Sequence, residues 1–267
     1  MFDPAPNGQK DSTDAYAPPV IATRVEAAGI AKAALPALPT ITLGVLAGAF
    51  IAFGGMLYTL AITESGIGFG PTRLLGGLAF SLGLILVVLG GAELFTGNNL
   101  IVMAWADGKV RTRALLRNWG LVYLGNLIGS VATAILVHTS GILQLGDMTA
   151  TAVAIAEGKV ALPPLEAFVR GLLCNTLVCL AVWLCHGARG AGEKILAIAF
   201  PISAFVALGF EHSVANMYLI PVGWLAGAET VTLSNFAAKL AIVTLGNIFG
   251  GSVLVAFVYW IVYLRAR

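Results

Sequence analysis

The chain has 267 residues, of which 15 are Lys or Arg and 13 are Asp or Glu, while 58% are apolar. Soluble domains carry about 25% charged residues because their surface faces water, and this chain carries 10%. The composition therefore excludes a water-soluble globule and indicates an integral protein of the lipid bilayer. With a net charge of +2 and dispersed basic residues, the chain offers no basic surface for nucleic acid.

The N-terminal region divides into two short segments. Residues 1–19 are rich in Pro, Asp, Ser and Ala and lack a continuous apolar stretch, which is typical of a disordered cytoplasmic start and not of a cleaved signal peptide. Residues 20–35 mix apolar and charged side chains, which predicts a short helix lying at the membrane interface. The alternative for this segment is an extension of the first transmembrane span.

Six apolar stretches follow and predict an all-α channel domain with six transmembrane helices over residues 36–265. Four stretches contain no charged residue, and the other two contain one acid each, Glu93 and Glu211. About 20 apolar residues cross the roughly 30 Å hydrocarbon core, and a charge at its centre costs roughly 2.5 to 3.5 kcal/mol. The stretches are residues 33–63, 74–106, 118–146, 171–188, 195–228 and 240–264.

Basic residues gather in alternate connections between these stretches. Because Lys and Arg are retained on the cytoplasmic side, this pattern predicts a multi-pass protein of the cell inner membrane with both termini in the cytoplasm. Arg170, at the start of the fourth stretch, is explained by snorkelling. The basic segments contain Lys109, Arg111, Arg113 and Arg117, then Arg189 and Lys194, and finally Arg265 and Arg267.

Two short patterns repeat along the spans. Because each half has three spans, an odd number, halves at about 36–146 and 165–265 must cross the bilayer in opposite directions, which predicts an inverted 3+3 repeat. The repeated elements are Leu124-Gly125-Asn126 and Leu245-Gly246-Asn247, preceded by Glu93 with Asn98 and by Glu211 with Asn216.

The centres of the second and fifth spans combine acid, amide, hydroxyl and glycine residues. This mixture predicts that both helices are broken there, and irregular backbone is tolerated in a membrane only where it is buried in protein or lines a water-filled cavity. Two facing breaks therefore predict a permeation path. We expect Glu93 and Glu211 to support the breaks by accepting hydrogen bonds from freed backbone N–H groups, with proton transfer as the alternative role. Asn98 and Asn216 are expected to belong to the same support of the broken helices.

Three motifs in these spans resemble the signatures of the formate/nitrite transporter family, over residues 20–265. The resemblance implies an aquaporin-like helical fold, a homopentamer with one pore per protomer, and passage of small monovalent anions with or without a proton. The closing segment, 243–265, resembles the formate channels of the family more than the nitrite channels. The three motifs are Gly91-Ala92-Glu93-Leu94-Phe95-Thr96-Gly97-Asn98, residues 174–183 and residues 210–217.

The resemblance also implies a set of pore residues. His212 matches the central histidine, Thr96 the residue that faces it, Asn175 a polar lining residue and Lys159 the vestibule lysine. An anion in a narrow apolar ring loses its hydration and is favoured there as the neutral acid, and a histidine between the rings can donate a hydrogen bond or a proton. The residues that match the apolar constrictions are Phe80, Leu84, Val178 and Phe205.

Several functions remain open at this stage. Formate is the leading substrate, and nitrite and hydrosulfide are alternatives within the same family. A channel for water or glycerol would carry Asn-Pro-Ala helix caps, which the chain lacks. An enzyme would need a metal or nucleophile cluster, and neither a cofactor nor a metal or disulfide site is predicted from the scattered Cys174, Cys179 and Cys185.

Overall fold

The computed structural model describes residues 14–265, and this part of the chain is helical, without strands. Five of its helices are long and apolar enough to cross a membrane, which agrees with a multi-pass protein. The elements are α1 (Pro18–Ala34), α2 (Ala37–Ile62), α3 (Phe69–Leu89), η1 (Gly97–Ile101), α4 (Val102–Ala106), α5 (Thr112–Thr139), η2 (Ile142–Gln144), α6 (Met148–Ala161), α7 (Pro164–Gly187), α8 (Ala191–Ala207), α9 (Ser213–Leu225), α10 (Leu233–Ile248), η3 (Phe249–Phe257) and α11 (Val258–Tyr263).

The five long helices are α2, α3, α5, α7 and the continuous helix from Leu233 to Tyr263, whose middle section η3 is a π-helix. The remaining apolar stretch, 195–228, is divided between α8, with 17 residues, and α9, with 13. The stretch 74–106 is divided likewise, because the chain leaves the helical conformation between α3 and η1.

The helices extend beyond the charge-free stretches. α3 already contains Arg73, α7 contains Glu166 and Arg170, and α10 contains Lys239. A charged side chain near a helix end reaches a polar partner without ending the helix, so a charge is a poor marker of the helix boundary. The connection expected between the third and fourth spans also contains a helix, α6.

The N-terminal segment lies against the rest of the protein. Of the stretch expected to be disordered, residues 1–13 lie outside the described residues, and α1 begins at Pro18. The ring of Tyr16 lies between the guanidinium groups of Arg24 and Arg189, at 4.2 and 4.1 Å from its centroid. α1 is separated from α2 by Leu35 and Pro36.

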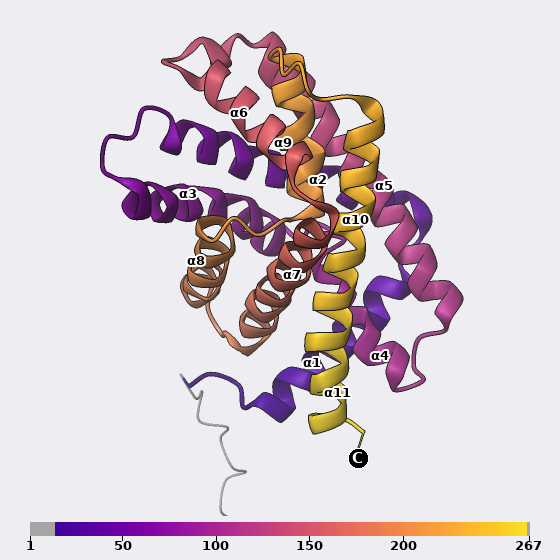
Figure 1. The fold of residues 1–267 in the computed structure, drawn as a ribbon. Coiled ribbons are helices and arrows are strands. Elements are labelled where there is room, and N and C mark those ends of the chain that lie inside the picture. Colours follow the sequence, from indigo (N-terminus) through magenta and orange to yellow (C-terminus); the bar gives the residue numbers. More distant parts are fainter. Residues whose placement is uncertain (1–13, 266–267) are drawn as a thin grey trace, which may run out of the picture.

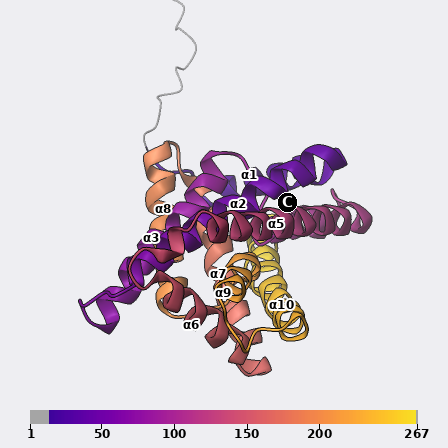
Figure 2. The ribbon, with the colours of Figure 1, turned by 90° about the horizontal axis from the view of Figure 1, so that it is seen from above.

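The elements are distributed over two ends of the molecule. α1, α4 and α11 lie together at one end, and α6 lies at the other (Figure 1). Seen from above, α6, α7, α9 and α10 form one group beside the crossing helices α2, α3 and α5 (Figure 2). Within these groups α2 packs on α3 and α5, and α7 packs on α10, whereas α8 contacts both α3 and α7.

Glycine allows the closest of these contacts. A Cβ atom on Gly129 would overlap the carbonyl oxygen of Val45, and one on Gly250 would overlap that of Leu172. The glycines near the two Leu-Gly-Asn motifs therefore let α5 approach α2 and η3 approach α7, as small residues do between membrane helices.

Candidate transport site

The first break follows the end of α3. Gly91 has a φ of +73°, which glycine adopts without strain, and the N–H of Ala92 donates to the carbonyl of Val87 at 2.9 Å. This is a common C-terminal turn of helices. The next N–H, that of Glu93, donates to the carbonyl oxygen of Leu43 in α2 at 3.2 Å. The chain therefore continues against a neighbouring helix.

The second break, after α8, has the same geometry. Gly209 has a φ of +72°, and the N–H of Phe210 donates to Phe205 at 2.9 Å. The N–H of Glu211 then donates to the carbonyl of Arg170 in α7 at 3.3 Å. Two different sequences thus leave their helices through the same turn.

Asn126 of α5 holds the first break. Its side-chain NH2 donates to the carbonyl oxygens of Gly44 and Glu93 at 2.8 and 2.9 Å, and its oxygen accepts from the N–H of Phe95 at 2.9 Å. Asn126 is fully buried. It therefore satisfies backbone groups that the break leaves without helical partners.

Asn247 of α10 makes the corresponding bonds at the second break. It donates to Gly171 and Glu211 at 2.7 and 2.9 Å and accepts from the N–H of Ser213 at 2.8 Å. The prediction that the glutamate carboxylates accept from the freed N–H groups is wrong, because the side-chain oxygens of the two asparagines accept these bonds. An amide side chain can in addition donate to the freed carbonyls, which an ionised carboxylate cannot do.

The two glutamates instead form ion pairs with lysines. Glu93 accepts from Lys32 at 2.6 Å and from Asn98 at 2.6 Å. Glu211 accepts from Lys159 at 2.9 Å and from Asn216 at 2.7 Å. Both carboxylates are buried, and a buried charge is stable only when it is paired and hydrogen-bonded.

Lys32 was missed by the sequence reasoning, although a signal for it exists. It begins the pattern Lys-x-Ala-Leu-Pro at residues 32–36, and Lys159 begins the same pattern at residues 159–163. Each lysine lies two residues before the end of its helix, α1 or α6. A search for a third repeated motif would have identified Lys32 as the counterpart of Lys159.

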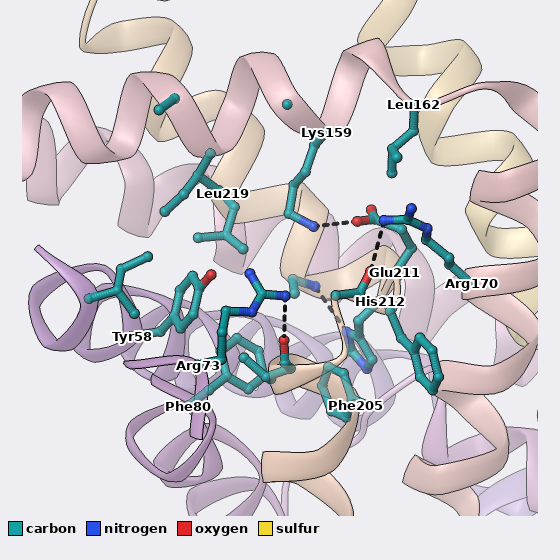
Figure 3. Close-up of a pocket in the computed structure, with 18 of the residues that line it drawn as sticks. Tyr58, Arg73, Phe80, Lys159, Leu162, Arg170, Phe205, Glu211, His212 and Leu219 are labelled. Atoms are coloured by element: carbon teal, nitrogen blue, oxygen red, sulfur yellow. Dashed lines mark hydrogen bonds and ion pairs between the residues drawn. The ribbon is translucent and has the colours of Figure 1, made fainter. Parts of the chain in front are cut away.

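Two cavities are lined by the lysine–glutamate pairs. The α6-side cavity has a volume of about 460 Å³ and is lined by Lys159, Glu211 and His212, among others (Figure 3). The α1-side cavity has a volume of about 420 Å³, and Lys32 and Glu93 contribute to its lining. Each cavity thus contains one of the two lysine–glutamate pairs.

His212 and Thr96 form a buried hydrogen bond next to the α6-side cavity, with 2.9 Å between Nε2 and Oγ1. The other ring nitrogen, Nδ1, accepts from the N–H of Ala215 at 3.0 Å and so caps the N-terminus of α9. An accepting Nδ1 carries no hydrogen, so the proton of the neutral ring is on Nε2. Nε2 therefore donates, and Thr96 accepts.

Apolar side chains contribute to the lining of both cavities. Phe80 and Phe205 contact each other edge to face at 5.7 Å, and Phe205 stacks on the His212 ring at 5.8 Å. Both phenylalanines line the α6-side cavity, whereas Leu84, one turn further along α3, lines the α1-side cavity. Val178 is buried in the same apolar cluster.

Asn175 lies against the first break. Its side-chain nitrogen is 3.2 Å from the Thr96 carbonyl oxygen, 2.9 Å from Asn99 Oδ1 and 2.7 Å from the Asn247 carbonyl oxygen. The residue is fully buried. Asn175 therefore links the first break, which contains Thr96, to α10. This linking contact was not part of the lining role expected for Asn175.

Comparisons with known proteins agree with this arrangement. The sequence matches the family description "Formate/nitrite transporter" over residues 19–261. It is 39% identical to the "Formate channel FocA" of Escherichia coli (strain K12), covering 94% of this chain and 96% of that protein. A "Probable formate transporter" of Methanothermobacter thermautotrophicus is 43% identical, over 88% of this chain and 92% of that protein.

A solved structure described as "Pentameric formate channel with formate bound" superposes with a TM-score of 0.80 at 40% identity, covering 86% of this chain and 98% of that chain. The protein belongs to the formate/nitrite transporter family. Its relatives are named as channels and transporters and not as enzymes.

Proposed function

We propose that the protein is a transmembrane channel for small monovalent anions, with formate as its first substrate. The path runs from the α6-side cavity past Phe80 and Phe205 to His212, and past Leu84 to the α1-side cavity. The observation that carries this proposal is the buried His212–Thr96 hydrogen bond beside the α6-side cavity, where Phe80 and Phe205 line the same cavity.

Formate is favoured over the other anions by the names of the relatives and of the superposed structure. That structure is pentameric, and a homopentamer with one path per protomer is the assembly that we propose here. Nitrite and hydrosulfide are the alternative substrates, because each is a small monovalent anion with a weak conjugate acid.

The proposed architecture has six spans in two inverted halves, with α3–η1–α4 and α8–α9 as the broken spans. It is supported by the recurrence of the same bonds around Asn126 and Asn247 and by the positions of α1 and α6 at opposite ends of the molecule (Figure 1). Both termini belong on the cytoplasmic side of the inner membrane, because the basic connections face that side.

The chemistry of the path follows from desolvation. A carboxylate among Phe80, Phe205 and Leu84 loses its hydration, so it crosses with a proton as the neutral acid or with a hydrogen bond from His212. Protonation of His212 at Nδ1 would break the cap of α9. The ring therefore stays neutral. Its Nε2–H donates to the passing solute in place of Thr96, and the transported proton travels on the solute.

The test is anion flux in proteoliposomes between about pH 5 and pH 8. We expect formate flux that rises with acidity, and about a tenfold loss in His212→Asn, which keeps an N-cap acceptor but removes the ring. Thr96→Val conserves shape and removes only the hydroxyl, so its loss is smaller, about fivefold.

Three outcomes would contradict the proposal. Flux of nitrite or hydrosulfide without formate would replace the substrate and keep the anion channel. Flux of glycerol or water without any anion would replace the class of solute. Unchanged flux in His212→Asn would remove the histidine from the path.

A further inference from the structure

Two arginines meet at the end of α8, at the α6-side cavity. Arg73 of α3 donates from Nε to the carbonyl of Ala207 at 2.8 Å and from Nη2 to that of Val206 at 3.2 Å. Arg170 of α7 donates to the carbonyl of Gly209 at 3.5 Å. A Cβ atom on Gly209 would lie 2.9 Å from Arg73 Nη2 and 3.8 Å from Arg170 Nη1, so both guanidinium groups approach one point.

The charges that line this cavity are unequally compensated. Lys159 is paired with Glu211, and Arg170 is paired with Glu166 at 2.9 Å. Within residues 14–265 no carboxylate lies within ion-pair distance of Arg73, whose hydrogen-bond partners are carbonyl oxygens. The cation with no acidic partner in this cavity is therefore Arg73, and not the lysine that the sequence indicated.

Arg73 also has donors to spare. A guanidinium group carries five N–H donors in one plane, and two of them are used on the carbonyls of α8. The remaining donors include both hydrogens of Nη1. A planar fork of this kind binds two oxygens of a carboxylate at once, and Figure 3 shows Arg73 and Arg170 reaching the cavity from opposite walls.

We propose that Arg73, with Arg170 beside it, forms an anion-binding site at the mouth of the α6-side cavity, where a planar oxyanion docks before it reaches His212. The inference rests on the proposed channel function and adds selectivity to it. Formate and nitrite present two oxygens to the fork, whereas hydrosulfide presents one sulfur and is attracted by charge alone. The mouth therefore favours planar oxyanions over hydrosulfide.

A structural role must be separated from binding, because both arginines also cap the carbonyl end of α8. Arg73→Gln retains an N–H donor for the carbonyls and removes the charge. Arg73→Lys retains the charge and removes the planar fork. Arg113→Gln removes an equal charge at an exposed position in the first turn of α5 and is the matched control.

The experiment measures initial formate and hydrosulfide flux over a range of concentrations, at low and high ionic strength, with pentamer content measured in parallel. In Arg73→Gln we expect the half-saturating formate concentration to rise about fivefold at low salt, with little change in the maximal flux, and the difference to shrink at high salt. Arg73→Lys should lose preference for formate over hydrosulfide while attracting both. Arg113→Gln should match the parent.

Each other result would overturn the inference. An unchanged half-saturating concentration in Arg73→Gln, with an active parent, would remove Arg73 from anion binding and leave the channel intact. A lower maximal flux that is the same at both salt concentrations would assign it a purely structural role. If the parent carries no anion at all, the proposed function fails first.

Discussion

The two halves of the chain, α1–α5 and α6–α11, support their helix breaks with equivalent hydrogen bonds but carry different side chains at those breaks. In the register set by the two glutamates, Leu94 corresponds to His212, and Thr96 corresponds to Val214. The hydroxyl and the imidazole that meet at 2.9 Å are thus contributed by different halves. The comparison teaches that the hydrogen bonds that support the breaks are repeated in both halves. The two groups that meet at the site are not repeated, because the first half contributes only the hydroxyl and the second half only the imidazole.

The halves also differ in how completely their polar groups are satisfied. Lys32 donates to both Glu93 and Asn98, and Asn98 donates in turn to Asn118 at 3.0 Å. In the second half the side-chain oxygen of Asn216 is buried without a hydrogen-bond partner. The Lys159 side chain is 16% exposed and that of Lys32 is 32% exposed, so the second pair is shielded more strongly from water.

The largest effect is expected for the asparagines that hold the breaks. Asn126→Leu and Asn247→Leu each remove three hydrogen bonds to buried backbone groups, which should cost roughly 3 kcal/mol in the free energy of unfolding. The measurement is loss of the assembled protein after heating, followed by size-exclusion chromatography in detergent. A large loss in one variant and none in the other would break the equivalence of the halves.

The lysine pairs should show a graded effect. Lys159→Met leaves a nearly buried carboxylate unpaired and should destabilise by about 2 kcal/mol, whereas Lys32→Met should cost about 1 kcal/mol because its pair is more exposed. Thermal melting at pH 7 measures both. Adding Glu211→Gln to Lys159→Met should recover part of the loss, since it removes the unpaired charge; equal effects of the two single variants would contradict the difference in burial.

The smallest effect concerns an ion pair at the α1 end. Hydrogen bonds from Lys109 and Trp260 lower the pKa of Asp107, so its contribution to stability is present above the unfolded pKa of 3.8 and is lost as the pH falls through the lower folded value. Asp107→Asn should cost about 0.5 kcal/mol or less because Lys109 is half-exposed. Melting curves should therefore separate at neutral pH and converge in acid.

Much of the fold was readable from the sequence, because apolar length and charge depletion are direct consequences of the bilayer. The helix ends were not, since Arg73, Arg170 and Lys239 lie inside helices and are satisfied by carbonyls or an acid at the helix ends. The helix α6 was missed because its charged residues, Glu157 and Lys159, resembled those of an exposed connection.

The site was predicted in part. His212 and Thr96 could be named from motifs, and the structure brings them into contact. The bonding roles of Asn126 and Asn247 were hidden because a Leu-Gly-Asn motif also serves close packing, and packing explains its glycine without its asparagine. Lys32 could be identified only from a third repeated motif. The absence of an acidic partner near Arg73 depends on distances in the folded protein, which the sequence does not give.

The hydrogen bonds that Asn126 and Asn247 make to the breaks stay within one half of the chain each, and a ribosome delivers the halves one after the other. Asn126 can bond Phe95, Gly44 and Glu93 before α6 has been synthesised. The contacts between halves, such as Thr96 with His212 and Tyr123 with Thr244, must wait for the second half. The transport path is therefore completed last during biosynthesis, when the two halves, each with the hydrogen bonds of its own asparagine already formed, pack against each other.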